Sequence, residues 1–197
     1  MAGKKSSGIK ISWVLIVAFI FVSLSLILLV FAFPKAKAPS TTTNLNDNKT
    51  EEPIENNYVL NIAKLNLSAP IIINVDGNDK DAYNKALEGG VAHLLGSALP
   101  GQAGNPFIFG HSSYYAWKPG NYKQIFKNLN DLEVGGSITI SSNLSTYNYK
   151  VTDKEIVQPN DVAVANQNYT EKKLTLMTCW PIGSDKERLV VVGVLQE

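Results

Sequence analysis

Three of the rarest residues in this 197-residue chain are also among its most reactive. Cys179 is the one cysteine, Arg188 is the one arginine, and His111 is one of two histidines. A thiol attacks a carbonyl as its thiolate, and a nearby imidazolium or guanidinium favours that form. An imidazole can also give a proton to a departing amine, and a guanidinium can stabilise an oxyanion. Together these side chains could transfer an acyl group through a covalent thioester.

Each residue also has an ordinary structural interpretation. A cysteine in an apolar strand is often an inert part of the core. A histidine after glycine is often a turn residue, and Arg188 could form a surface ion pair with Asp185 or Glu187, of little energetic consequence. Taken singly, these interpretations are favoured.

All three residues lie at the ends of predicted strands. The relevant apolar runs are residues 107–109, 174–178 and 189–195. His111 follows the first run after Gly110, Cys179 ends the second, and Arg188 begins the third. The eight residues 180–187 contain Pro181 and Gly183 and are typical of a hairpin loop. If the flanking runs pair, strands about 4.8 Å apart bring the thiol and the guanidinium to one rim.

The part of the chain that must position these residues is mainly β. The folded body is predicted over residues 58–197, and the period-two and β-branched patterns predict strands at 59–62, 69–73, 107–109, 137–141, 147–152, 174–178 and 189–195. One helix is predicted at 79–88, with Ala82, Ala86 and Leu87 on one face and Gly89-Gly90 beyond its end. Seven or eight short strands and one helix indicate a mainly antiparallel barrel or sandwich.

The N-terminal third predicts a membrane anchor and a tether. Residues 1–10 form a short basic N-terminus, and residues 11–33 are 23 uncharged, apolar residues. At about 1.5 Å per residue they reach roughly 34 Å, enough to span a bilayer. A cleaved signal peptide is the alternative, because Ala36-Lys37-Ala38 offers a cleavage pattern, but the apolar run is longer than a signal core. Residues 34–57 are polar and predict a flexible linker.

Charge and cysteine content exclude several classes of protein. The three lysines before the apolar run favour a cytoplasmic N-terminus and an exported, extracytoplasmic body. The formal net charge is +1, and the body after residue 33 carries about −2, so there is no basic footprint for nucleic acid. A single cysteine excludes an internal disulfide framework.

The order and local sequence of the reactive residues resemble the sortase family, and this resemblance favours the catalytic interpretation over the structural ones. The resemblance rests on Gly110-His111-Ser112, on the TLxTC string of residues 175–179, and on Arg188 nine residues after the cysteine. The family's segment before its histidine, with a class D or E character, is resembled by residues 90–93, 98–101 and 104–105. The family's early strands are resembled by residues 64–70. The similarity covers residues 58–197.

The resemblance implies a fold, a reaction and a set of partners. The expected fold is an eight-stranded sortase β-barrel with one or two short helices, after one N-terminal transmembrane helix. The expected enzyme cleaves a C-terminal LPxTG-like sorting signal of surface proteins through a cysteine thioester. It then transfers the acyl group to an amine of cell-wall peptide or a pilin-type lysine. Cys179, His111 and Arg188 inherit the catalytic positions, and Thr178 is expected to support the substrate and oxyanion region.

Other features refine this expectation. Residues 112–119 form an aromatic insertion that departs from the family pattern, and His93 matches a non-catalytic histidine of many members. No cofactor or metal ligand set is predicted. Calcium activates some members, whereas scattered acids such as Asp131 and Glu133 are usually solvated surface.

Three alternatives differ in their local sequence or chemistry. An L,D-transpeptidase would have glycine before the cysteine, where this chain has Thr178, and a papain-like hydrolase would place its cysteine at a helix N-terminus. The alternative from another class is a non-enzymatic, membrane-tethered β-domain that binds a surface ligand. Reactivity of the Cys179 thiol distinguishes that class from an enzyme.

Overall fold

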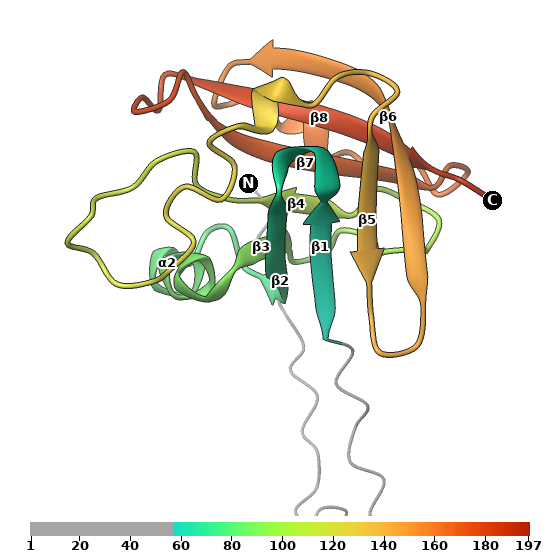
Figure 1. Cartoon of the computed structure of the whole chain (residues 1–197), viewed down its shortest axis with the longest axis horizontal. Helices are drawn as coiled ribbons and strands as arrows, with labels where there is room; N and C mark the ends of the chain where they lie inside the picture. Colours follow the sequence, from blue (N-terminus) through green and yellow to red (C-terminus); the bar gives the residue numbers. More distant parts are fainter. Residues whose placement is uncertain (1–56) are drawn as a thin grey trace, which may run out of the picture. The chain divides into compact units, whose positions relative to one another are not determined.

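The computed structural model describes residues 57–197, in which eight strands close into one barrel. Figure 1 shows the β1–β2 and β5–β6 hairpins beside the long β7–β8 pair. The strands are β1 (Tyr58–Ile62), β2 (Leu67–Val75), β3 (Val91–Leu94), β4 (Phe107–Phe109), β5 (Ser137–Ser141), β6 (Thr146–Val157), β7 (Lys173–Trp180) and β8 (Glu187–Leu195). The helical elements are α2 (Lys80–Gly89) and the 3-10 turns η1 (Ala63–Leu65), η2 (Leu129–Asp131) and η3 (Val162–Ala165). The predicted eight-stranded barrel is confirmed.

The predicted segments 1–10 and 11–33 lie outside the described residues, as does all but the last residue of the predicted linker 34–57. Within residues 57–197, none of the helices has the length and apolar character that crossing a bilayer requires.

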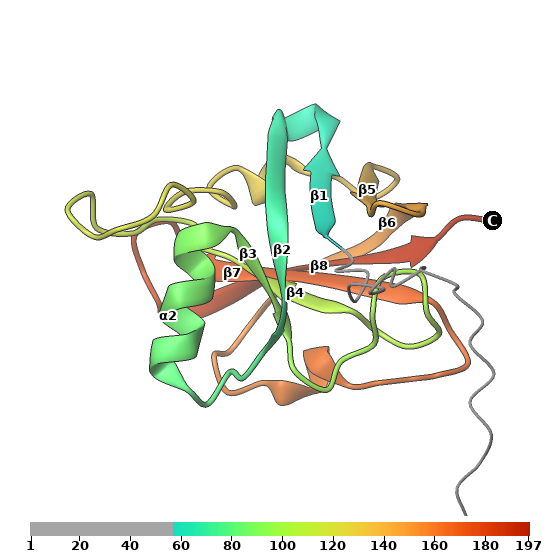
Figure 2. The same cartoon turned by 90° about the horizontal axis from the view of Figure 1, so that it is seen from below.

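The order around the barrel is β1-β2-β3-β4-β7-β8-β6-β5, and most neighbouring strands are antiparallel. The parallel pairs are β2–β3 and β4–β7. Parallel neighbours need a crossover, and α2 supplies the one between β2 and β3. Figure 2 shows α2 lying alongside β3 outside the barrel, so the helix adds a layer on this face.

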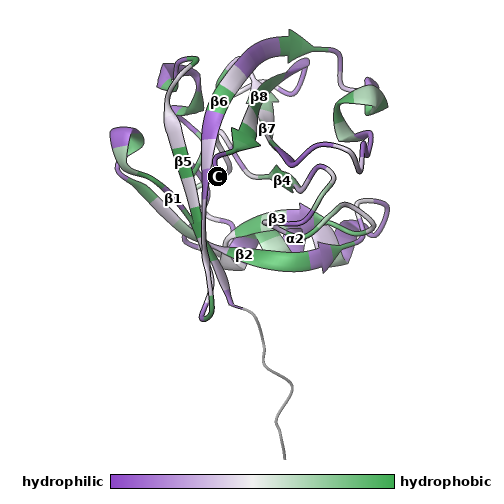
Figure 3. Ribbon diagram, turned by 90° about the vertical axis from the view of Figure 1, so that its right-hand side faces the viewer, coloured by the Kyte–Doolittle hydropathy of each residue, from purple (hydrophilic) through white to green (hydrophobic). Residues whose placement is uncertain are grey.

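Two apolar clusters hold these elements together. The barrel interior contains fully buried side chains from every part of the ring, including Leu60, Ile108, Ile138, Leu176 and Val191. The second cluster lies between α2 and the outer face of β3 and β4. Figure 3 shows hydrophobic ribbon along β4 and β7, the strands that have packed neighbours on both faces.

The helix prediction is correct in extent but wrong about one residue on its buried face. Asp79 caps the helix, since its carboxylate accepts hydrogen bonds from the backbone N–H groups of Asp81 and Ala82. Ala86 and Leu87 are buried, whereas Ala82 is exposed. Tyr83 occupies the inner position instead and stacks on Phe109, with ring centroids 5.1 Å apart. The buried stripe is therefore i, i+3, i+4 counted from Tyr83.

Candidate functional site

Cys179 and Arg188 lie opposite one another on β7 and β8, where they are register partners. Directly opposed residues in a sheet point to the same face. The pairing of the two runs that flank the loop is thus as the sequence predicts. The loop itself spans residues 181–186 and is shorter than predicted, because Trp180 and Glu187 belong to the strands. We call residues 181–186 the hairpin loop.

The neighbouring strand β4 brings His111 to the same end of the sheet. β4 runs parallel to β7, with Phe109 opposite Met177, and the Gly110 N–H donates to the Met177 carbonyl at 3.2 Å. Continuing this register by two residues sets His111 level with Cys179. The path requires a glycine at position 110, because a Cβ there would lie 2.9 Å from the Phe126 ring.

Cys179 and His111 line one open groove of about 540 Å³. Helix α2 contributes Tyr83 and Asn84 to its wall, and the hairpin loop contributes Asp185. Cys179 is half-buried, so its thiol is within a walled site and still accessible. We call this space the catalytic groove.

Arg188 is held by the main chain next to the groove and is not among the residues that line it. Its Nη1 donates to the carbonyl oxygens of Asp185 at 2.8 Å and of Glu187 at 2.9 Å. Among residues 57–197 it makes no ion pair with the carboxylates of Asp185 or Glu187. Both bonds use Nη1, so the donors on Nε and Nη2 have no bonded partner in the described part of the chain.

Thr178 lies on the opposite face of β7 from Cys179. Its side chain is buried, with 2% of its surface exposed, and its hydroxyl donates to the Gly110 carbonyl at 2.8 Å. The contact ties β7 to the residue before His111. A role for Thr178 in the substrate region stays a prediction, and its side chain could exert such a role only through the backbone that it fixes.

The groove changes the acid–base properties of two of its residues. Burial lowers the pKa of His111 from its ordinary value of 6.5. Burial has the opposite effect on Tyr83 and raises its pKa, because the charged form of a tyrosine is the deprotonated one. Nearby Cys179 raises the pKa of Tyr83 further, and Arg188 lowers it. The Tyr83 hydroxyl therefore lies within electrostatic reach of Cys179 and Arg188. No group of three or more His, Cys, Asp or Glu within residues 57–197 is arranged to hold a metal ion.

Sequence reasoning missed the groove residues Tyr83, Asn84 and Tyr114. The signal for Tyr83 was its i, i+3, i+4 spacing with Ala86 and Leu87 on the helix. The signal for Tyr114 was its place three residues after His111 in an aromatic run. Its ring stacks on the His111 imidazole, with centroids 4.3 Å apart and planes 8° from parallel.

Known proteins resemble this chain in both sequence and fold. The family model for the Sortase domain matches residues 60–196. The structure of a Clostridium perfringens Sortase D5 transpeptidase is 30% identical, with a TM-score of 0.59, over 76% of this chain and 86% of that one. Sortase C-1 from Actinomyces oris is 28% identical, with a TM-score of 0.60, over 71% and 73% of the two chains. YwpE of Bacillus subtilis (strain 168), whose own sortase assignment is provisional, is 34% identical over 36% of this chain and 69% of its own length.

Proposed function

The chain belongs to the sortase family of transpeptidases, and from that premise we propose that it is a cysteine transpeptidase with Cys179 as its nucleophile. The Cys179 thiolate attacks the carbonyl carbon before the scissile peptide bond of a sorting signal. The C–N bond breaks, and a thioester links the acyl group to Sγ. An acceptor amine then attacks the thioester, forms a new amide and releases the thiolate.

The observation that carries the proposal is the meeting of three strand ends at one groove. β4 leads to His111, β7 holds Cys179 in the same groove, and β8 holds Arg188 opposite Cys179, although β4 lies more than 60 residues before β7 in the sequence. His111 gives a proton to the leaving amine and accepts one from the incoming amine. Arg188 directs its remaining donors to the substrate carbonyl or to the oxyanion.

The proposed substrates follow from the family. The donor is a surface protein that ends in an LPxTG-like sorting signal, and the acceptor is an amine of cell-wall peptide or a lysine of a pilin-type subunit. We also propose that residues 11–33 anchor the enzyme in the membrane and that residues 58–197 lie outside the cytoplasm. The supporting features are the uncharged apolar run and the lysines before it.

A thiol-labelling experiment tests the nucleophile. The full-length protein is treated with a methanethiosulfonate reagent and assayed with fluorogenic sorting-signal peptides, with and without an amine acceptor. Labelling reports on Cys179 alone, because the chain has one cysteine. We expect wild type to be labelled and to cleave a matching peptide, and Cys179→Ala to do neither while its circular dichroism is unchanged.

The same experiment distinguishes the non-enzymatic alternative. A folded wild-type protein whose thiol is inert to the reagent would contradict the proposal and favour a ligand-binding β-domain. Peptide cleavage that persists in Cys179→Ala would contradict it as well.

A further inference from the structure

A ladder of ring contacts begins at His111 and runs out to the surface. Tyr114 covers one face of the imidazole, Tyr115 packs on Tyr114 with centroids 5.6 Å apart, and Trp117 packs on Tyr115 at 4.8 Å. Exposure rises along the ladder, from a half-buried Tyr114 to Trp117, which is 77% exposed. All three rings belong to residues 112–123, which we call the aromatic loop.

The aromatic loop is fixed at its base, so the stack on His111 is a built feature. The Phe126 N–H donates to the His111 carbonyl at 2.9 Å, and Lys123 Nζ donates to the Ala116 carbonyl at 2.9 Å. The loop returns to helix α2 at Gly120, where φ is +95° and a Cβ would lie 2.6 Å from the Glu88 Cα. A residue with a side chain could not make this approach, so Gly120 lets the loop close against α2.

The stacked pair also borders two spaces. One is the catalytic groove, and the other is a smaller cavity of about 200 Å³ that includes Glu88 and Lys118 in its lining. His111 and Tyr114 line both. The ring nitrogens of an imidazole lie on its edge, so a neighbour that covers the face leaves them able to exchange protons.

We propose that Tyr114 is a positioning residue for His111, which holds the imidazole plane in the groove and stabilises its protonated form. The inference rests on the proposed function for its catalytic meaning. An aromatic face attracts a cation that lies over it, and this attraction grows when the cation is shielded from water. The imidazolium that follows proton uptake from the acceptor amine is such a cation.

Other titratable groups lie in the same cavities as His111, and the test must hold them constant. Besides Tyr114 itself, the charged or titratable side chains that share a cavity with His111 are Tyr83, Tyr115, Cys179 and Asp185 in the groove and Glu88, Lys118 and Lys123 in the smaller cavity. Replacing Tyr114 by leucine leaves all of them in place and keeps apolar bulk over the ring. Replacement by alanine would instead admit water and mix two effects.

The direct test is a histidine titration by NMR in full-length protein with isotope-labelled histidine. The chain has two histidines, so His93 serves as an internal reference. We expect the pKa of His111 to fall in Tyr114→Leu, to stay near wild type in Tyr114→Phe, and to stay unchanged in the control Tyr115→Leu, which alters the next ring out. Tyr114→Met provides a second variant should the leucine fail to fold.

Kinetics supply the second arm. With a peptide that wild type turns over, we expect Tyr114→Leu to lose about tenfold in kcat, equivalent to one cation–π contact, with a small change in KM and recovery in Tyr114→Phe. A His111 titration that is the same in wild type, Tyr114→Leu and Tyr114→Met would overturn the inference. A wild-type protein that cleaves no peptide would contradict the proposed function. The NMR comparison would still show whether Tyr114 stabilises the protonated form of His111.

Discussion

At the scale of single residues, the arrangement of Arg188 makes a sharp distinction between charge and geometry. The Nη1 atom is bound to the carbonyls of Asp185 and Glu187, so the rest of the planar guanidinium is oriented by the protein before substrate arrives. A lysine has the same charge but lacks a planar fork that could bind these carbonyls and a substrate together.

Arg188→Lys is therefore expected to lose most of the transpeptidation rate. Removal of one oxyanion donor typically costs about 10²- to 10³-fold in kcat, and the thermal midpoint should stay near that of wild type. Turnover of a fluorogenic sorting peptide and a melting curve measure the two effects. Equal turnover by wild type, Arg188→Lys and Arg188→Ala would remove Arg188 from the proposed mechanism.

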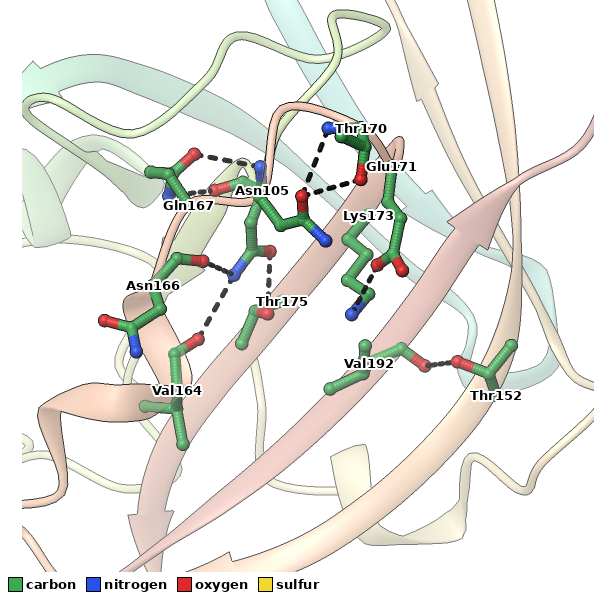
Figure 4. A network of polar contacts seen from close by, with 11 residues as sticks. Asn105, Thr152, Val164, Asn166, Gln167, Thr170, Glu171, Lys173, Thr175 and Val192 are labelled. Carbon is green, nitrogen blue, oxygen red and sulfur yellow. Dashed lines mark hydrogen bonds and ion pairs between the residues drawn. The ribbon is translucent and has the colours of Figure 1, made fainter.

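At the scale of elements, a polar network fastens the β6–β7 connection to β7 and to the segment before β4. Figure 4 shows Asn105 at its centre, with Oδ1 accepting from the Thr175 hydroxyl at 2.8 Å and Nδ2 donating to the Val164 carbonyl at 3.2 Å. Gln167 completes it, because its Nε2 donates to the Asn105 carbonyl and its Oε1 accepts from the Asn105 N–H, both at 2.9 Å. The network thus joins segments that flank both β4 and β7, the strands that lead to His111 and Cys179.

Asn105→Ala should destabilise the fold, because it leaves the buried Thr175 hydroxyl without its acceptor. We expect a loss of about 2–3 kcal/mol in the free energy of unfolding. Denaturant titration measures it, and Asn128→Ala, at an exposed asparagine, is the control and should change stability by less than about 0.5 kcal/mol. In the double variant with Thr175→Val, the loss of stability should be smaller than the sum of the two single-variant losses, because both substitutions break the same hydrogen bond.

The elements that sequence patterns predict well are those with one buried face. β5 and the first half of β6 alternate between buried and exposed residues, and both were predicted. β3 was missed because Val91, Ala92 and His93 are all buried and show no alternation. The outer half of β6, residues 153–157, was missed for the opposite reason, since this end extends past the core and has no buried face.

The site, like the fold, was predictable only where a local pattern in the sequence reports on it. Cys179, His111 and Arg188 are conspicuous in the sequence because they are rare and lie at predicted strand ends, and the structure places Cys179 and His111 in one groove with Arg188 opposite Cys179. The pairing of β4 with β7 could not be read from a local pattern, because parallel partners are joined through distant chain. Tyr114 was placed in an aromatic insertion without a partner, and its contact with His111 depends on how the aromatic loop folds back.

At the scale of the whole molecule, buried histidines link stability to pH. His93 is fully buried, its Nε2 lies 2.9 Å from the Ala98 carbonyl, and its Nδ1 accepts from the Asn74 N–H at 3.3 Å. This arrangement fits a neutral ring that donates from Nε2. Burial lowers the pKa of His93 below 6.5, partly opposed by the bond to Ala98, and burial also lowers the pKa of His111.

The direction of the pH dependence follows from these shifts. Below about pH 6.5 the unfolded chain binds protons that the folded chain does not, so the free energy of unfolding should fall as the pH drops through this range. Melting curves from pH 8 to pH 5 test this. His93→Gln should be less stable at pH 8 and should lose part of the slope, whereas an unchanged slope would contradict the assignment.

Membrane topology is a separate prediction for the whole chain. We take residues 11–33 as an uncleaved anchor with the N-terminus inside. Protease added to cells whose cytoplasmic membrane is intact, and which have no barrier outside it, should then digest residues 58–197 and spare the region of Lys4. An antibody tag at each end would report both outcomes on one blot. Recovery of a soluble form that begins near Pro39 would favour the cleaved-signal alternative.

The closure of the barrel has a consequence for how a peptide can be recognised. Many peptide-binding domains seat their ligand as an extra strand on an open sheet edge, where main-chain hydrogen bonds supply affinity for almost any sequence. Around the ring of residues 58–195, each strand already has a hydrogen-bonded neighbour on both sides. A substrate peptide therefore finds no full-length free edge to extend as a ninth strand, and we expect it to be read by side chains and loop backbone. Grafting residues 112–123 and 181–186 from another family member should accordingly transfer its sequence preference while leaving the barrel unchanged.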